Sequence, residues 1–244
     1  MTALIRFKPH GGGILDRNKR DGAVLVLGDT MKSASVWSDM SGRGNHGLVY
    51  GATTPPPATP QALGYLFDGV DDYVDAGNDA SLNFTKTSSF SGSAWINISN
   101  IAASNYIFSK QRILSPYEGY GFSVNTDGKL WVQLVDTTVK SKRVNSSQTL
   151  VGGVWYHVGF TYNGSTSASG IKIYINGLDK TGTILFDEAF ITDMSNILPF
   201  QIGVRDITHE PFNGSIDEVR IYNRALSAGE ITKLFNRYRG KFGI

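Results

Sequence analysis

The chain has 244 residues, of which 41% are hydrophobic and 11% aromatic, a composition that supports a substantial core and excludes a disordered or low-complexity protein. It has no cysteine, which excludes disulfides, thiolate metal sites and thiol catalysis. The net charge is +2, but residues 1–20 sum to +4 and residues 230–244 to +3. Such basic ends can dock on an acidic protein surface or on nucleic acid, but short charged ends are more often simply solvated. The acidic remainder offers nucleic acid no binding surface.

No apolar run approaches the roughly 18 residues that a membrane-spanning helix needs. The first residues also lack the apolar core of a signal peptide. We therefore expect neither a transmembrane segment nor an export signal in this sequence.

Residues 1–22 form a polar, glycine-containing stretch with mixed charges, and we expect a flexible basic arm there. After it, short runs rich in Val, Ile, Phe, Tyr and Trp alternate with Gly, Asn, Asp and Ser clusters, which predicts strands. The clearest runs are 23–27, 64–67, 73–76, 93–98, 106–109, 121–125, 130–135, 155–162, 171–176, 200–204 and 215–222. With no helix between them, residues 23–244 are predicted to form one all-β domain with a closed or double-layered sheet.

One helix is predicted at the end of the chain, over residues 227–238. Ser227 and Glu230 have the spacing of a capping box, which satisfies free amides at a helix start. An apolar stripe then recurs at helical spacing, formed by Ile231, Leu234, Phe235 and Tyr238. This face is expected to rest on a sheet of the same subunit or on a neighbouring subunit, so a homo-oligomer stays open.

Two patterns suggest catalysis and are rejected. Residues 42–47 match G-x-G-x-x-G, but a proline run follows instead of the helix that a dinucleotide site needs. The chain has no E-x-D-x-E pattern for glycoside hydrolysis. Asp217 and Glu218 are adjacent on a predicted strand, so they are expected to point to opposite faces and not to work as a pair.

Aromatic residues fall into two groups. Trp95, Trp131 and Trp155 lie inside strand patterns and are expected in the core, because tryptophan in an alternating strand usually fills the space between sheets. Three tyrosines flank or lie within a long loop and are the candidates for stacking on sugars: Tyr106, Tyr117 and Tyr120.

Residues 68–72 read Asp-Gly-Val-Asp-Asp, an oxygen-rich turn of the kind that binds calcium. Asp68 and Asp71 can equally fix a tight turn by accepting hydrogen bonds from backbone amides. The local sequence alone favours the turn.

The order of motifs resembles that of laminin-G-like, concanavalin A-like jelly-roll domains. The motifs are DMSGRGNHG at 39–47, LFDGVDDYV at 66–74, SAWI at 93–96, WYHV at 155–158, IYING at 173–177 and FNGSIDEVRIYNRALS at 212–227. The resemblance implies two antiparallel sheets packed face to face, with the first and last strands side by side. It also implies a structural calcium ion, for which Asp68, Asp71 and Asp217 would meet across the sheet edge.

Domains of this kind are typically non-catalytic binders of glycans or proteins, and cysteine-free, free-standing versions resemble virion components of bacteriophages. We therefore expect a binding or display module on a phage virion surface, as a capsid decoration or tail-associated protein. Its ends would dock on a capsid or tail protein, and its loops would meet glycans or another cell-surface polymer. Outside a virus, an extracellular or cell-surface location is expected. The alternatives are a divergent glycan hydrolase or lyase, using Asp217 or Glu218 with Asp71, and a purely structural cement protein.

Overall fold

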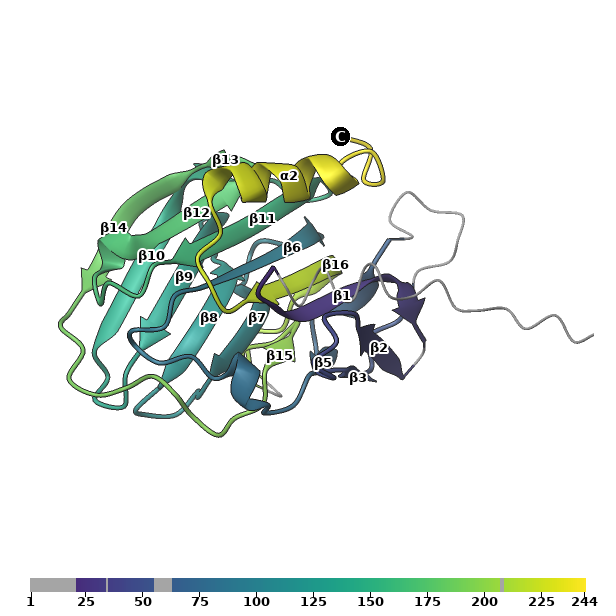
Figure 1. Ribbon diagram of the computed structural model, residues 1–244. Helices are drawn as coiled ribbons and strands as arrows, with labels where there is room; N and C mark the ends of the chain where they lie inside the picture. The colour runs from purple at the N-terminus through teal and green to yellow at the C-terminus, as the bar shows by residue number, and fades with distance from the viewer. Residues whose placement is uncertain (1–20, 34, 55–62, 207–208) are drawn as a thin grey trace, which may run out of the picture.

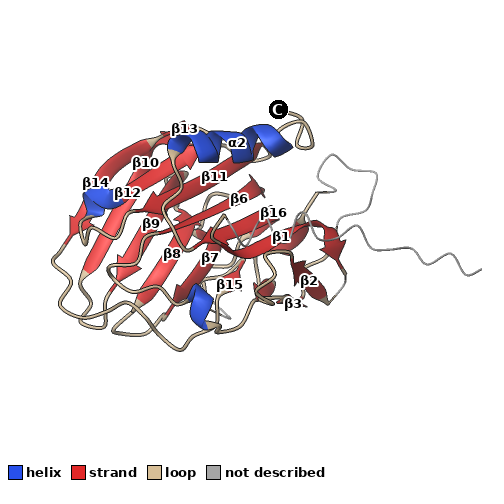
Figure 2. Cartoon of the chain, viewed as in Figure 1, coloured by secondary structure: helices blue, strands red, loops and turns tan. Residues whose placement is uncertain are grey.

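The computed structural model describes residues 21–33, 35–54, 63–206 and 209–244. The predicted basic arm therefore lies outside the described residues, apart from its last two. The described chain is mostly antiparallel strands with one α-helix close to the C-terminus (Figures 1 and 2).

The strands follow one another along the chain with only short helical turns between them. Their bounds are β1 Ala23–Lys32, β2 Val36–Asp39, β3 Gly47–Tyr50, β4 Tyr65–Asp68, β5 Tyr73–Asp75, β6 Phe90–Ile98, β7 Asn105–Gln111, β8 Gly119–Val124, β9 Lys129–Val135, β10 Ser141–Thr149, β11 Trp155–Tyr162, β12 Ile171–Ile175, β13 Leu178–Asp179, β14 Thr181–Asp187, β15 Gln201–Ile202 and β16 Asn213–Tyr222. Two single-turn 3₁₀ helices span Ala80–Leu82 and Ala168–Gly170, and the α-helix α2 spans Ala228–Tyr238.

The strands pair in the order β13-β12-β11-β6-β16-β1-β2-β3-β5-β15-β7-β8-β9-β10-β14, and β4 also pairs with β16. This ribbon folds into two layers, because aromatic rings of β6 and β11 meet rings of β8. Phe90 lies 5.1 Å from Tyr120, and Phe160 lies 5.3 Å from Phe122, between ring centroids. The first layer is β13, β12, β11, β6, β16 and β1; the second is β15, β7, β8, β9, β10 and β14. The predicted jelly-roll sandwich of antiparallel sheets is confirmed.

The first and last strands lie side by side, as the resemblance implied. In the β1–β16 pair, Val26 is opposite Arg220 and Leu27 is opposite Val219. Strand boundaries agree with the sequence pattern where apolar residues alternate, as in β11, which spans the predicted residues 155–162. The β12–β13 hairpin turns at Asn176 and Gly177, both with positive φ, as expected of an Asn-Gly turn.

Strands β2, β3, β10, β13 and β14 were not predicted. β10 carries polar residues on both faces, so it has no apolar alternation to reveal it. Its Lys142 is nonetheless buried, because the ammonium group donates to the Glu188 carbonyl and lies 3.0 Å from the Asp187 carboxylate. Burial of a paired lysine replaces the apolar contact that a strand usually makes.

α2 covers the outer face of the first layer (Figure 1). The predicted capping box is present, with Ser227 accepting from the Glu230 amide and the Glu230 carboxylate accepting from the Ser227 amide. Ile231 and Leu234 pack on β1 and β16 residues. Phe235 and Tyr238 pack on Trp95, Trp155 and Phe242, so these tryptophans are buried under the helix and not between the sheets.

Candidate functional site

The outer face of the second layer is the broad sheet surface that α2 leaves uncovered. On β8, Tyr120, Phe122 and Val124 point into the core, so the alternate positions point outward. The strand register aligns one outward row across β7, β8, β9, β10 and β14, formed by Ser109, Gly121, Gln133, Arg143 and Phe186. We call this surface the outer face; at its centre the buried Tyr106 ring lies over Gly121, which has no side chain.

Arg143 forms an aromatic stack on one side of that centre. Its guanidinium carbon lies 5.1 Å from the ring centroid of Trp131 and 5.0 Å from that of Phe186. Both distances lie within the range of cation–π interactions, so the charged group packs against two rings. Phe186 is 46% exposed, so one of the two rings offers apolar surface to a ligand.

Arg205 forms a second stack on the other side. Its guanidinium carbon lies 5.7 Å from the Tyr106 ring and 5.8 Å from the Tyr117 ring. Its Nη1 also donates to the Glu210 carboxylate at 3.0 Å. Burial raises the pKa of Tyr106 to about 12, although the nearby Arg205 charge opposes that rise. The Tyr106 hydroxyl is therefore neutral at physiological pH.

Several buried polar atoms on the outer face have no hydrogen-bond partner among the described residues. Gln111 is 2% exposed; its Nε2 donates to the Tyr117 carbonyl, but its Oε1 has no donor. Gln201 is 3% exposed and its Nε2 has no acceptor. Three further nitrogen atoms have no acceptor among the described residues: Trp131 Nε1, Arg143 Nε and Arg205 Nε. Native proteins rarely leave buried polar atoms unpaired. Those of Arg143 and Arg205 belong to the two stacks, whereas Trp95, Trp155 and His157 carry others on the α2 side of the molecule.

Two of the three tyrosines predicted to bind sugar, Tyr106 and Tyr117, are brought together by Arg205. The third is misplaced by the prediction: Tyr120 is 2% exposed and belongs to the core. Its hydroxyl donates to the Leu82 carbonyl at 2.8 Å, and its ring contacts Phe90. On β8 it occupies an inward position between Gly119 and Gly121, so it cannot stack on an external ligand.

Arg143 and Arg205 were not predicted as site residues, and Trp131 was wrongly expected in the core. The Trp131 side chain lies on the outer face, opposite to its neighbours Leu130 and Val132, which are fully buried. The alternation in β9 carried this signal, because residue 131 shares its face with Gln133.

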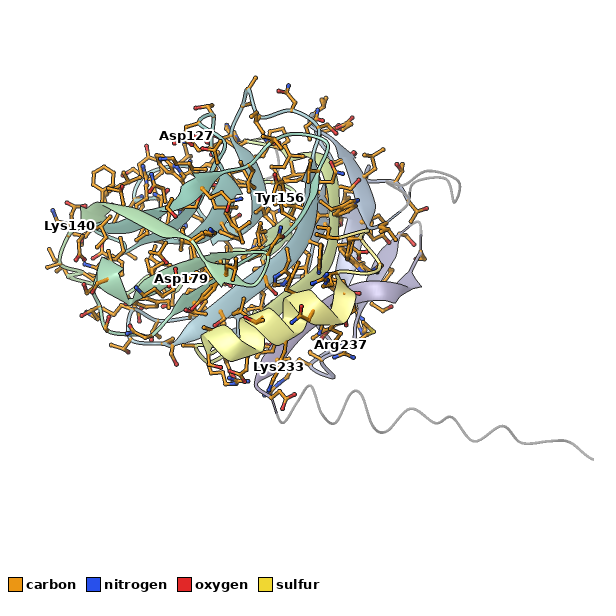
Figure 3. All side chains as sticks on the ribbon, turned by 90° about the horizontal axis from the view of Figure 1, so that it is seen from above. Asp127, Lys140, Tyr156, Asp179, Lys233 and Arg237 are labelled. Carbon is orange, nitrogen blue, oxygen red and sulfur yellow. The ribbon has the colours of Figure 1, made fainter. Side chains whose placement is uncertain are left out.

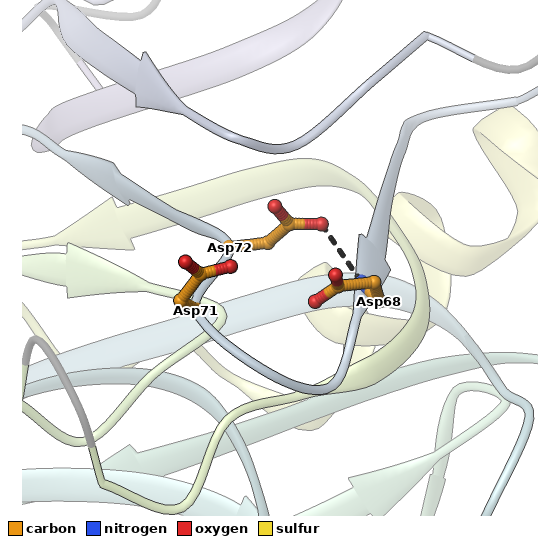
Figure 4. A group of neighbouring side chains, drawn as sticks. All are labelled: Asp68, Asp71 and Asp72. Atoms are coloured by element: carbon orange, nitrogen blue, oxygen red, sulfur yellow. Dashed lines mark hydrogen bonds between the residues drawn. The ribbon is translucent and has the colours of Figure 1, made fainter.

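Asp68, Asp71 and Asp72 form the acidic cluster, defined by carboxylate oxygens that all lie within 4.8 Å of one another (Figure 4). Asp72 Oδ2 accepts from the Asp68 amide and Asp68 Oδ1 accepts from the Val70 amide, each at 2.8 Å. Burial raises the pKa of Asp72, the hydrogen bond from Asp68 opposes the rise, and repulsion from Asp68 and Asp71 adds to it. A set of carboxylate oxygens that repel one another fits a hard divalent cation.

The structure does not bring Asp217 to this cluster. Asn213 is the β16 residue that pairs with Asp68, and Asp217 lies four residues further along the strand, roughly 13 Å away at strand spacing. The Asp217 carboxylate instead accepts from the Lys241 ammonium at 2.8 Å. The three residues of the suggested hydrolase or lyase site, Asp217, Glu218 and Asp71, are likewise not gathered in one place.

Asp217 and Glu218 do not point to opposite faces, contrary to the expectation from strand alternation. The β16–β6 register shifts between Asp217 and Arg220, and Glu218 has a φ of 49°. This bulge turns both carboxylates toward Lys241, whose ammonium lies 3.5 Å from Glu218 Oε1. Glu218 also pairs with Arg220 at 2.7 Å, and both side chains are buried.

A family model described as the concanavalin A-like lectin/glucanases superfamily, a laminin G model, matches residues 68–232. Since this match covers more than half of the sequence, the chain belongs to that superfamily, and the resemblance seen in the motifs is confirmed. A search of curated proteins found no match.

Solved structures similar to this chain include binding domains and an enzyme. The binding domain of Paraclostridial Mosquitocidal Protein 1 is 21% identical with a TM-score of 0.67, and the match covers 90% of this chain and 53% of that one. The receptor binding domain of botulinum neurotoxin D is 18% identical with a TM-score of 0.64, and the match covers 90% of this chain and 53% of that one. Trypanosoma rangeli sialidase in complex with 2,3-difluoro-KDN is 18% identical with a TM-score of 0.65, and the match covers 91% of this chain and 33% of that one. This chain thus spans about half of the two toxin chains and a third of the sialidase. These similarities establish the fold. No helix in the described residues is long and apolar enough to cross a membrane.

Proposed function

We propose that the protein is a non-catalytic carbohydrate-binding module whose sugar site is the outer face. The observation that carries the proposal is the pair of arginine–aromatic stacks on this face. Sugar rings present C–H groups that pack on aromatic faces, and hydroxyls that need fixed polar partners. Phe186 and Tyr117 supply exposed ring surface, while the guanidinium groups of Arg143 and Arg205 supply polar donors.

The similar structures support a binding role without defining the ligand. Two of them are binding domains of toxins, one of which is named for receptor binding. The sialidase favours the competing enzyme hypothesis, but the match covers only a third of its chain. Against catalysis here, the carboxylates of Asp217 and Glu218 are buried and held by Lys241 and Arg220. Glu210, at the outer face, is paired with Arg205.

Direct binding tests the proposal. The full chain would be applied to a glycan array, and the best ligand titrated by calorimetry against the wild type, Trp131→Ala and Tyr117→Ala. We expect each substitution to weaken binding at least tenfold. Tyr50→Ala is the matched control, because Tyr50 is an exposed ring stacked on Tyr73 and away from the outer face. Absence of glycan binding would refute the proposal, and turnover of the ligand that Asp217→Asn abolishes would establish the enzyme alternative.

A structural calcium ion is part of the proposal, with Asp68, Asp71 and Asp72 as its carboxylate ligands. The close approach of their oxygens and the raised pKa of Asp72 support it. Asp72 replaces Asp217 in the set that the family resemblance implied. Held next to β16 by the pairing of Asp68 with Asn213, the ion would fix the turn between β4 and β5. It would have no part in catalysis.

For the site of action we propose a surface exposed to cell-surface polymers, with a phage virion as the first setting to examine. The support is the basic charge of the two ends. Residues 1–20 lie outside the described residues, but Lys233, Arg237 and Arg239 are exposed on or just after α2, and the first two are visible in Figure 3. This basic helix surface would dock on a capsid or tail protein and leave the outer face free. A mass-spectrometric inventory of purified particles tests this setting, and absence from virions would refute it.

A further inference from the structure

We infer that the glycan bound at the outer face is acidic, with a carboxylate or sulfate group held between Arg143 and Arg205. This inference rests on the proposed function, because it names the class of sugar that the same surface takes.

The two guanidinium groups belong to one site. Arg143 and Arg205 each interact electrostatically with the other and with Tyr106. Arg143 shares its row with Gly121, two strands away, a backbone spacing of roughly 10 Å. The Tyr106 ring, which carries Arg205, lies against Gly121, where an added Cβ would be 2.7 Å from Cε1 of the ring. The two arginines therefore border the same Tyr106 ring.

The charges of the site are not balanced within the described residues. Arg205 has Glu210 as a carboxylate partner, whereas Arg143 has no carboxylate within ion-pair distance there. Burial lowers the pKa of Arg143, and repulsion from Arg205 adds to this effect, while Tyr106 and Glu210 partly oppose it. An anionic group on the ligand would relieve both effects, which a neutral sugar would not.

The chemistry of arginine also suits an anion. Its planar guanidinium group presents N–H donors as a fork that matches the two oxygens of a carboxylate or sulfate. Lysine would not serve equally, because its ammonium group lacks the planar fork.

The alternative role of the stacks is structural, in which the cations simply hold the aromatic rings in place. That role requires neither the second arginine close to the first nor the unpaired polar atoms around them. It also predicts no preference between acidic and neutral ligands, so the two roles are separated by a binding experiment.

The experiment uses the full chain on an array of neutral, uronate-containing, sialylated and sulfated glycans, followed by titration with dextran, carboxymethyl-dextran and dextran sulfate. These three polymers share one backbone and differ in charge, and the last two distinguish carboxylate from sulfate. We expect an anionic polymer to bind at least tenfold more tightly than dextran. Arg143→Gln and Arg205→Gln should each reduce that preference at least fivefold, and added salt should reduce it in the wild type.

Arg143→Lys keeps the charge and tests the fork alone, with folding of each variant checked by its thermal melt. Arg237→Gln removes the same charge from α2 and serves as the matched control. Equal binding of dextran and the anionic polymers, or binding of neutral glycans alone on the array, would overturn the inference and leave the proposed function standing. A preference abolished by Arg237→Gln and unaffected by Arg143→Gln would place anion binding on the helix and overturn it as well. No binding to any glycan would refute both.

Discussion

Lys241, in the segment after α2, donates to the fully buried carboxylate of Asp217 on β16 at 2.8 Å. The next residue, Phe242, stacks on Trp95 of β6 with ring centroids 4.1 Å apart. The C-terminal segment therefore packs on the first layer and covers part of the sheet face that faces away from the second layer.

Lys241→Met should destabilise the protein strongly, because it removes an ammonium group that donates to the buried Asp217 carboxylate. Breaking a buried pair on one side costs about 3 kcal/mol of unfolding free energy, and the partial exposure of Lys241 sets the expectation at roughly 2 kcal/mol. Urea denaturation monitored by tryptophan fluorescence measures the change.

Two further variants isolate the pair. Lys233→Met removes an exposed lysine from the same end of the chain and should change stability by less than about 0.5 kcal/mol. Asp217→Asn combined with Lys241→Met should recover part of the loss, since the buried carboxylate charge is then removed as well. Equal stability of Lys241→Met and the wild type would show that the C-terminal segment is not anchored through this contact.

Asp136, buried just after β9, should govern the acid limb of the stability curve. Burial alone would raise its pKa, but hydrogen bonds from four residues outweigh burial and hold the pKa at about 2. The donors are Thr138, Lys140, Ile191 and Thr192. Because this pKa lies below the unfolded value of about 3.9, the carboxylate stabilises the fold above pH 4, and that contribution disappears as the pH falls toward 2.

Asp136→Asn should therefore lower the unfolding free energy by about 2 kcal/mol at pH 7, and the difference from the wild type should shrink between pH 4 and pH 2. Denaturant titrations at a series of pH values test this. Asp127→Asn, in an exposed turn, should leave the pH profile parallel to that of the wild type (Figure 3). A difference at Asp136 that stays constant with pH would refute the role of its charge.

Calcium should raise the melting temperature of the wild type, since an ion that binds only the folded chain stabilises it by mass action. At a concentration one hundred times the dissociation constant the gain is about 2.7 kcal/mol. Asp71→Asn should abolish the calcium-dependent shift, whereas Asp127→Asn should keep it. Scanning calorimetry in chelator and in excess calcium makes the comparison, and identical wild-type melts in the two conditions would remove the ion from the proposal.

The architecture could be predicted from the sequence because most strands show apolar alternation and the helix begins with a capping box. Ile171, Ile173 and Ile175 are buried on β12 as their period-two spacing requires, and Ser227 caps α2. Strand β10 was not predicted because its buried Lys142 is paired with Asp187, which is far from it in sequence, and no local pattern shows this pairing.

The site was harder to predict, because it depends on pairing between strands distant in sequence. Tyr106 and Tyr117 were identified, but the link between them is Arg205, which lies almost ninety residues beyond Tyr117 in the chain. Asp217 was wrongly assigned to the calcium site because the register that pairs Asp68 with Asn213, four residues earlier, cannot be read from the sequence. The opposite orientation expected for Asp217 and Glu218 was wrong because of a bulge, which leaves no mark on the residue pattern. Trp131 was wrongly assigned although the alternation of β9, with Leu130 and Val132 buried, already placed residue 131 on the outward side.

Gly121 allows the Tyr106 ring to lie on the floor of the outer face, and Gly121→Ala tests that arrangement. An added Cβ would lie 2.7 Å from Cε1 of the ring and 3.1 Å from Gln111 Oε1, so the ring must move. Since Arg205 is carried by this ring, we expect the glycan affinity to fall at least tenfold and the melting temperature to drop by only a few degrees. Gly229→Ala, where an added Cβ meets open space on α2, is the matched control for a methyl group added at a glycine. Unchanged affinity in Gly121→Ala would show that the ligand does not contact this part of β8, and the sugar site would have to lie elsewhere on the molecule.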